Sequence, residues 1–392
     1  MQKQIYLDYA ATTYLRQEAL EAMVPYMSEI YGNPSSLHDF GRKAKLAVDG
    51  ARLKIAGVFH ALPEEVYFTS GGTESDNWAV TGAAYANMKK GGHIVTSRVE
   101  HPAVLNAFKR LEAEGFRVTY IDVDENGTLD LKQLKESLGP ETTLVSVMYA
   151  NNEIGTIQPI EEIGGIVKQY SKAYFHVDAV QAAGAVDIKL DRLRTIDLMS
   201  FSGHKFYGPK GVGGLFIRKG TRIQPLLAGG SQERGKRAGT ENVPGIVGMA
   251  KALELAAAEM PEESARLKRL RDRLIERVLG EIDYVRLNGH STDRLPNNAN
   301  FSFDFIEGES LLMRMSTLGV AASTGSACSS ASLEPSHVLL AIGLKHETAH
   351  GSYRITLGKR TTQEDIDYTA DALKRVVGEL REMSPLYQKK GA

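Results

Sequence analysis

The feature that most restricts the fold of this chain is the alternation of short β-rich runs with helical patterns over its first two-thirds. Amphipathic stretches such as residues 103–114 and 160–170 separate several of the runs and would cover the faces of a sheet. This alternation is typical of an α/β domain with a mainly parallel sheet. Seven runs have the composition of strands: Glu65–Thr69, His93–Ser97, Arg117–Asp122, Thr143–Met148, Tyr174–Asp178, Leu198–Ser202 and Gly213–Ile217.

The pattern changes near residue 260. A helical pattern runs from about Val247 to Ala258 and restarts after Pro261. Beyond it, two strand-like runs (residues 300–305 and 352–357) and two helical runs (310–318 and 363–383) indicate a smaller α+β domain. Because 392 residues exceed one typical domain, we expect a large domain over residues 15–260. Residues 1–14 and 261–392 would form the small domain.

Composition excludes several classes of partner and site. The formal net charge is -1, so nothing predicts a nucleic acid or an anionic membrane as partner. No apolar run approaches the ~20 residues that cross a bilayer, and the first eight residues lack the pattern of a signal peptide; we therefore expect a cytoplasmic protein. The single cysteine, Cys328, excludes an internal disulfide and a cysteine-rich metal site, and no intrinsic metal is expected.

Polar residues follow the predicted strands at the edge where parallel sheets bind ligands. Ser70-Gly-Gly-Thr-Glu74 opens a helix after the first run, and its free N–H groups favour a phosphate. A tight turn capped by Thr73 explains the segment equally well. After the second run, His101 precedes Pro102, where a histidine can stack on a flat ring or move protons. A helix cap or a surface residue is the alternative for His101.

Two further strand ends carry a carboxylate and a lysine. Asp178, with Gln181 one turn later, could keep a ring nitrogen protonated, although an Asp there is also a common helix N-cap. Lys205 follows Ser202-Gly-His204, and an amine among small residues beyond a buried strand is suited to a Schiff base. Lys210 is the competing lysine, but Gly-Pro-Lys-Gly is typical of a solvent-facing turn. Together these loops predict a pyridoxal phosphate site.

The only thiol lies in a segment of small side chains, residues 321–332. Such a segment has little apolar surface to anchor it, so we expect a mobile loop over about residues 321–333. An ordinary cysteine, with a pKa near ~8.5, is partly thiolate at neutral pH. A tightly packed turn is the alternative, but beside a pyridoxal site we favour Cys328 as a mobile nucleophile.

With these residues in view, the chain resembles the cysteine desulfurases of the NifS/IscS kind, within the fold-type I, class-V aminotransferase superfamily. The likeness covers nearly the whole chain. Its most specific segments are Ser200-Phe-Ser-Gly-His-Lys205 and Gly325-Ser-Ala-Cys328. Others are Tyr6–Thr13, Gly32–His38, Thr69–Ser75, Asn151–Gly155, Arg237–Asn242 and Arg354–Gly358.

The resemblance implies a role for each matching residue. Lys205 would be the Schiff-base lysine, Cys328 the persulfide carrier, and His101 the group stacked on the pyridine ring. Asp178 would face the ring nitrogen and Gln181 the phenolic oxygen. The remaining matches would contact phosphate, cofactor or substrate: Gly72, Thr73, Ser202 and His204 at the phosphate, Thr240 at the phosphate of the neighbouring subunit, Asn152 at cofactor and substrate, and Arg354 with Asn33 at the substrate carboxylate.

The activity implied is removal of sulfur from L-cysteine, giving alanine and a persulfide on Cys328. A homodimer is implied as well, and a sulfur-acceptor protein of iron–sulfur assembly or tRNA thiolation; Cys328 could also ligate an iron–sulfur cluster transiently. The chain ends soon after Tyr387, where housekeeping relatives carry a longer docking tail; this difference argues against a general scaffold-feeding role and is compatible with a dedicated acceptor. The alternatives are a selenocysteine lyase or another class-V aminotransferase. A non-catalytic sulfur carrier would have lost Lys205, Asp178 or Arg354, and all three are present.

Overall fold

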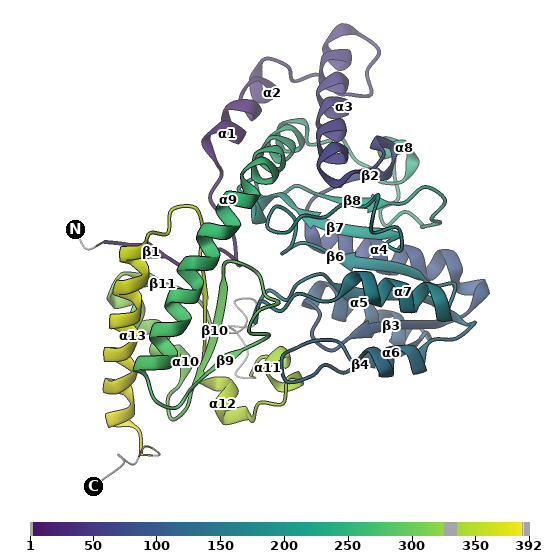
Figure 1. Cartoon of the computed structure of the whole chain (residues 1–392). Coiled ribbons are helices and arrows are strands. Elements are labelled where there is room, and N and C mark those ends of the chain that lie inside the picture. Colours follow the sequence, from purple (N-terminus) through teal and green to yellow (C-terminus); the bar gives the residue numbers. More distant parts are fainter. Residues whose placement is uncertain (1–2, 325–334, 386, 388–392) are drawn as a thin grey trace.

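A seven-stranded, mainly parallel sheet forms the centre of the larger part of the molecule, as the sequence predicted (Figure 1). The computed structural model describes residues 3–324, 335–385 and 387. The strand order is β2-β8-β7-β6-β5-β3-β4, and only the pairs that involve β8 are antiparallel. The strands are β2 (Val66–Thr69), β3 (His93–Ser97), β4 (Arg117–Ile121), β5 (Thr142–Met148), β6 (Tyr174–Asp178), β7 (Leu198–Ser202) and β8 (Gly213–Ile217).

Helices cover both faces of this sheet. Successive strand residues point to opposite faces, so Ile94 packs with one set of helices and Val95 with the other. One face carries α4 (Gly72–Asn87) and α5 (Pro102–Ala113). The other carries α3 (Asp39–Phe59), α6 (Leu131–Ser137), α7 (Ile160–Tyr170) and the start of α9 (Val243–Glu281). Because both faces are buried, the strands are apolar along nearly their whole length.

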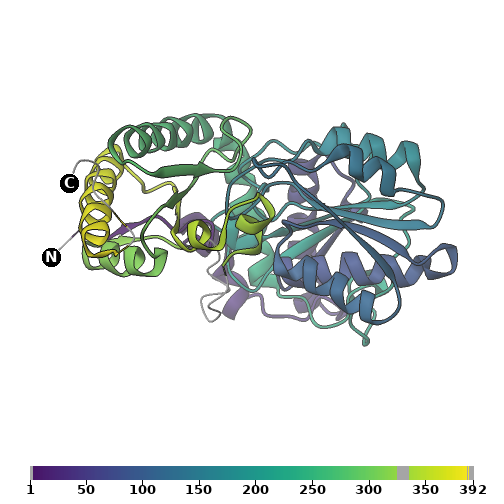
Figure 2. The same cartoon turned by 90° about the horizontal axis from the view of Figure 1, so that it is seen from below.

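A smaller unit lies beside the large sheet, at the left of Figures 1 and 2. It has its own buried core, which includes Phe301, Tyr353 and Leu373. Its strands form a β12-β10-β9 sheet and a β1–β11 pair. The elements are β1 (Ile5–Tyr6), β9 (Val285–Asn288), β10 (Asn298–Phe303), α10 (Gly308–Thr317), β11 (Val320–Ala321), α12 (His346–His350), β12 (Ser352–Thr356) and α13 (Gln363–Met383).

One helix, α9, runs through both units without a break. The sequence predicted an interruption at Pro261, and this is wrong, because Pro261 lies inside a continuous helix of 39 residues. A proline inside a helix removes one hydrogen bond. Here Leu253 packs in the core of the large unit and Leu270 in the core of the small one, so burial on both sides stabilises the continuous form. The expected domain limit near residue 260 falls within this helix and stays a prediction.

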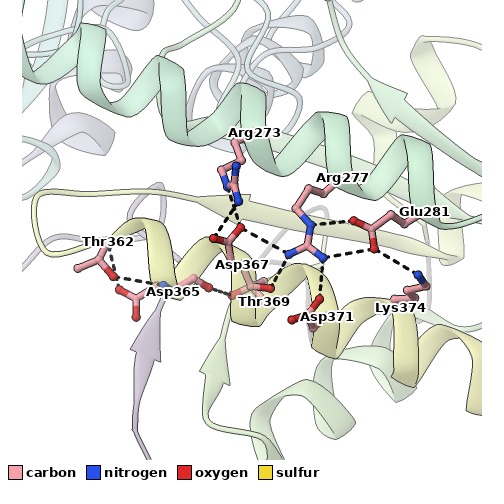
Figure 3. A network of polar contacts seen from close by, with 9 residues as sticks. All are labelled: Arg273, Arg277, Glu281, Thr362, Asp365, Asp367, Thr369, Asp371 and Lys374. Carbon is pink, nitrogen blue, oxygen red and sulfur yellow. Dashed lines mark hydrogen bonds and ion pairs between the residues drawn. The ribbon is translucent and has the colours of Figure 1, made fainter.

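Ion pairs join α9 to the closing helix α13 (Figure 3). Arg273 donates to both carboxylate oxygens of Asp367, at 2.7 and 3.0 Å. Arg277 lies between Glu281 and Asp371. Such exposed pairs contribute little each, so burial of the apolar face of α13 is the main stabilisation. Among the described residues, no helix is both long enough and apolar enough to cross a membrane.

Candidate active site

The loops that follow β2, β3, β5, β6 and β7 surround one cavity of about 260 Å³, which the small unit closes through β12. Residues distant in sequence meet there because the parallel strands end at the same edge of the sheet. Ten of the predicted site residues line the cavity: Gly72, Thr73, His101, Asn152, Asp178, Gln181, Ser202, His204, Lys205 and Arg354.

The start of α4 forms one wall of this cavity. Gly71 is the N-cap, at φ 154° and ψ -175°, a conformation that favours glycine, and no side chain caps the helix. The alternative in which Thr73 caps the helix is therefore wrong. Ser202 and His204 line the same cavity, and the His204 ring is hydrogen-bonded to the Thr12 hydroxyl at 3.1 Å. An uncapped helix start beside hydroxyl and imidazole groups suits a phosphate.

Lys205 projects into the cavity from a 3₁₀ turn, Gly203–Lys205, directly after β7. Its Nζ donates hydrogen bonds to the carbonyls of Ala10 and Ala11, at 2.5 and 2.9 Å. Lys210 is exposed and does not line the cavity. The geometry therefore favours Lys205 as the lysine of the site.

The helix cap that the sequence offered as an alternative is present at His101, but the described residues directly after Asp178 form a turn rather than a helix. The Asp178 Oδ1 accepts the Val180 N–H at 2.9 Å, and the His101 Nδ1 accepts the Ala103 N–H at 3.1 Å. Both nevertheless line the cavity. Burial, with a smaller effect of Lys205, lowers the pKa of His101 to about 4, so its ring is neutral at neutral pH. A neutral imidazole can both stack on a ring and exchange a proton.

Arg354 provides an anion-binding group on β12. Its side chain is 2% exposed, and it donates to the Asp8 Oδ1 at 2.9 Å and to the Asn152 carbonyl at 3.1 Å. Its Nε is buried and makes no hydrogen bond to the described residues. These contacts fix the plane of the guanidinium group, which a bidentate contact with a carboxylate requires.

Two described site residues of the prediction do not line this cavity, and a third predicted residue is not described. Asn33 is exposed and does not line it. Thr240 is also exposed and lines a separate cavity of about 180 Å³. Cys328 lies outside the described residues. The described residues on either side of residues 325–334 are hydrogen-bonded to residues that line the cavity. On the N-terminal side, Ser323 exchanges two backbone hydrogen bonds with Arg354.

On the other side of the segment, the Ser336 hydroxyl donates to the Glu153 Oε2 at 2.5 Å. Ser336 caps α11 (His337–Ala341), whose Val338 and Leu339 pack on residues beyond β3 and β5. Burial raises the pKa of Glu153 to about 7. Among the described residues, no cluster of His, Asp or Glu is arranged to hold a metal ion.

The sequence reasoning missed three buried acids around the site. Asp76 and Glu153 line the cavity, and Glu100 is fully buried beside His101, which lines it. Glu100 and Glu153 are next to His101 and Asn152 in sequence, and Asp76 is one helical turn after Thr73. Adjacency to a predicted site residue was the available signal. Burial, which gives these acids their chemical interest, cannot be read from sequence.

Replacing Glu100 by glutamine should change how stability depends on pH. Burial raises the pKa of Glu100 to about 8, whereas an unfolded glutamate titrates near ~4.3. The proton that Glu100 retains therefore stabilises the fold fully below the unfolded pKa, and this contribution is lost as pH rises through the folded pKa. Glu100→Gln should gain stability relative to the wild type by up to about 1.4 kcal/mol per pH unit between roughly pH 5 and 8.

Denaturant titrations at half-unit steps of pH would measure this difference. The glutamine Oε1 can still accept the hydrogen bonds that the Glu100 Oε1 accepts from Ser97 and Met148. Any remaining difference in packing adds an offset in stability that is the same at every pH, so the slope against pH is the quantity to compare. Glu161→Gln, at an exposed position on α7, controls for the loss of a surface charge. A difference between Glu100→Gln and the wild type that does not vary with pH would contradict the assignment.

Comparison with protein families identifies the class-V aminotransferases: the family described as "Aminotransferase class-V" matches residues 5–369. Among curated proteins, cysteine desulfurase IscS of Clostridium botulinum is 56% identical over 390 residues, which are 99% of this chain and 98% of that protein. Cysteine desulfurase IscS of Methanosarcina thermophila is 55% identical over 387 residues, 99% of this chain and 95% of that protein.

Solved structures give the same picture. A NifS-like protein superposes with a TM-score of 0.91 at 41% identity, over 96% of this chain and all of that one. A NifS-like protein of Rickettsia africae reaches a TM-score of 0.85 at 31% identity, over 96% of this chain and 100% of that one. SspA in complex with cysteine reaches 0.80 at 38% identity, over 91% of this chain and 99% of that one.

Proposed function

The chain belongs to the class-V aminotransferase family and, within it, to the cysteine desulfurases, and on this premise we propose that it removes sulfur from L-cysteine with pyridoxal phosphate and Cys328. The observation that carries the proposal is that one cavity gathers Lys205, Asp178 and Arg354, an amine, an acid and an anion-binding group. Each of the three comes from a different element, and each can perform a step that the reaction requires.

The residues of the cavity fit pyridoxal phosphate. At the uncapped start of α4, Gly72 lies so close to Val180 that a Cβ there would meet the Val180 Cγ2 at 2.8 Å, so a glycine is needed for the helix start to sit at the cavity. We assign the phosphate to this helix start with Thr73, Ser202 and His204, and the ring nitrogen to Asp178. Gln181 would face the phenolic oxygen, and His101 the ring. When bound, the cofactor supplies an electron sink that weakens the bonds at the substrate Cα.

The protein's own groups would orient the substrate and move its protons. Arg354, assisted by Asn152 and in our proposal by Asn33, binds the carboxylate and so fixes the Cα within reach of Lys205. The Lys205 amine takes the α-proton and returns a proton later in the reaction. His101, neutral at neutral pH, can accept the proton of the substrate thiol.

Cys328 would take the sulfur. Its thiolate forms an S–S bond with the substrate sulfur as the substrate Cβ–S bond breaks, so cysteine leaves as alanine and the enzyme retains a persulfide. Two described residues that flank Cys328 in sequence support this role. Ser323 and Ser336 are both hydrogen-bonded to residues that line the cavity. Five residues span at most about 18 Å, so the length of the chain allows Cys328 to reach the substrate site.

We further propose a homodimer that passes the persulfide to an acceptor protein. Large apolar side chains, among them Tyr31, Leu37 and Phe40, are exposed near α3, as expected of a surface that a second subunit covers. Thr240 is exposed as well, which suits a contact with the neighbour's phosphate. A reducing compartment keeps a reactive cysteine as the free thiol, so we place the protein in the cytoplasm. Acceptors of iron–sulfur assembly or tRNA thiolation have the matching chemistry.

Reconstitution tests the function directly. The purified protein with pyridoxal phosphate should absorb visible light, form alanine from L-cysteine, and carry an extra sulfur on the peptide that contains Cys328, as detected by mass spectrometry. A parallel assay with L-selenocysteine separates the lyase alternative. Alanine formed from selenocysteine alone, or a protein that stays colourless, would contradict the proposal.

Arg354→Lys should raise the KM for cysteine by about 10–100-fold, because one or two charge-assisted hydrogen bonds to the carboxylate are lost. The kcat should change much less, since the carboxylate is bound equally in ground and transition states. Initial rates over a range of cysteine concentrations would separate the two constants. Arg269→Lys, at an exposed position on α9, is the matched control. An unchanged KM with a reduced kcat would refute the assignment.

A further inference from the structure

Asp76 is a buried acid of the cavity that the mechanism above does not use. It lies on α4 three residues after Thr73, so both side chains are on the same face of the helix. Both line the cavity, and Asp76 is only 1% exposed. The helix α4 packs across β5, β6 and β7, and along it Asp76 is buried whereas Thr73 is exposed.

The surroundings of Asp76 provide little that would stabilise a charge. Neither of its carboxyl oxygens makes a well-formed hydrogen bond to the described residues. The His176 Nε2 is 3.8 Å from the Oδ1, and the Ser200 hydroxyl lies beside the carboxyl group. That hydroxyl is itself hydrogen-bonded to His176, at 2.9 Å.

His176 brings no positive charge to this pocket. It is fully buried, and burial lowers its pKa to about 3, so the ring is neutral. Its Nδ1 is hydrogen-bonded to the Ser146 hydroxyl at 2.8 Å. Ser146, His176 and Ser200 therefore form a chain of neutral polar groups that ends at Asp76.

The two aspartates of the cavity differ in their neighbours. Burial raises the pKa of Asp178 to about 6, but Asp178 accepts the N–H of Val180 and faces the positive charge of Lys205, and both of these favour its ionised form. Asp76 has neither. Burial, and then the negative charge of Asp178, raise the pKa of Asp76 well above its ordinary value, and the nearby Ser200 hydroxyl opposes them only in part. Two carboxyl groups so placed share a proton, and the one with the hydrogen bond and the nearby positive charge ionises first.

We propose that Asp76 is a positioning residue that keeps a proton beside Asp178, so that the negative charge facing the cofactor ring stays on Asp178. The inference rests on the proposed function, because it concerns how the ring nitrogen is held. A neutral Asp76 can donate its O–H to a neighbouring oxygen. It also adds no second negative charge to the cavity that Asp178 lines. An ionised Asp76 would compete with Asp178 for the proton and leave the ring with a weaker partner.

Two near-isosteric substitutions in the reconstituted holoenzyme test this role. Asp76→Asn keeps a neutral hydrogen-bond donor, and Asp76→Leu keeps the branched shape without one. We expect the visible absorption of Asp76→Asn to follow the wild type at every pH, with kcat within about threefold. Asp76→Leu should shift the pH profile of absorption and lose about tenfold in kcat, a size of effect found when a group that acts through another is removed.

A third measurement reads the proton itself. The infrared difference between wild type and Asp76→Asn at neutral pH should contain the carbonyl stretch of a protonated carboxyl group, and its absence would overturn the proposal even if Asp76→Leu does not fold. A shifted absorption profile in Asp76→Asn would mean that Asp76 is ionised. A Leu variant identical to the wild type would reduce Asp76 to a spacer.

The outcomes separate this inference from the proposed function. A wild-type protein that stays colourless with pyridoxal phosphate fails the function itself. A coloured wild type with an altered Asp76→Asn spectrum fails only the role of Asp76. Asp39→Asn, at an exposed position on α3, controls for substitution of an aspartate as such.

Discussion

Lys205→Ala should lose at least about 10⁴-fold in alanine formation, because general acid–base catalysis by one group contributes roughly 10²–10⁴-fold and covalent attachment of the cofactor is lost as well. The variant should still fold. The Lys205 side chain is only partly buried, and the carbonyls of Ala10 and Ala11 that its Nζ contacts can bind water in its place. Single-turnover assays with cysteine, beside circular dichroism spectra, would measure both effects.

Lys210→Ala is the matched control. Lys210 also comes after β7, five residues beyond Lys205, but it is exposed. It should keep full activity. Borohydride reduction of the wild type should attach the cofactor to the peptide that contains Lys205, and cleavage between the two lysines identifies the modified one. Attachment to Lys210, or substantial activity in Lys205→Ala, would refute the assignment.

The large sheet could be predicted because burial on both faces leaves a clear signal in the sequence. Each of its strands is an apolar run, and all seven were located within a residue or two. The strands that were missed lack this signal: β1 and β11 have two residues each, and β9 is half exposed. The break predicted at Pro261 failed because a local preference was outweighed by the burial of α9 on both sides of the proline.

The residues of the cavity that come directly after strands could be predicted from the sequence. The rule that ligands bind beyond strand ends located Lys205, Asp178 and His101 before any geometry was known. It could not find the carbonyls of Ala10 and Ala11, because a backbone oxygen has no residue-specific signature. Nor could it find Asp76, whose interest comes from burial beside a second carboxyl group. Helical spacing from Thr73 would have raised it as a candidate.

Cys328→Ser should abolish sulfur transfer and reduce alanine formation by roughly 10³-fold or more, on the scale seen when a nucleophile is removed. No second cysteine exists in the chain to replace it. A serine hydroxyl is a poor nucleophile without a neighbouring base. The cavity itself is unchanged, so the variant should keep its colour and still show the spectral change that follows addition of cysteine.

Stoichiometry makes this test sharp. Without reductant or acceptor, the wild type should stop after a burst of alanine that matches its one thiol per chain, whereas Cys328→Ser should give no burst. Ser329→Ala, the neighbouring position, is the control and should retain the burst. Because substrate binding and proton transfer at Lys205 do not need the thiol, a burst in Cys328→Ser would mean that the C–S bond breaks without Cys328, and the reaction would then be a lyase that releases sulfur directly.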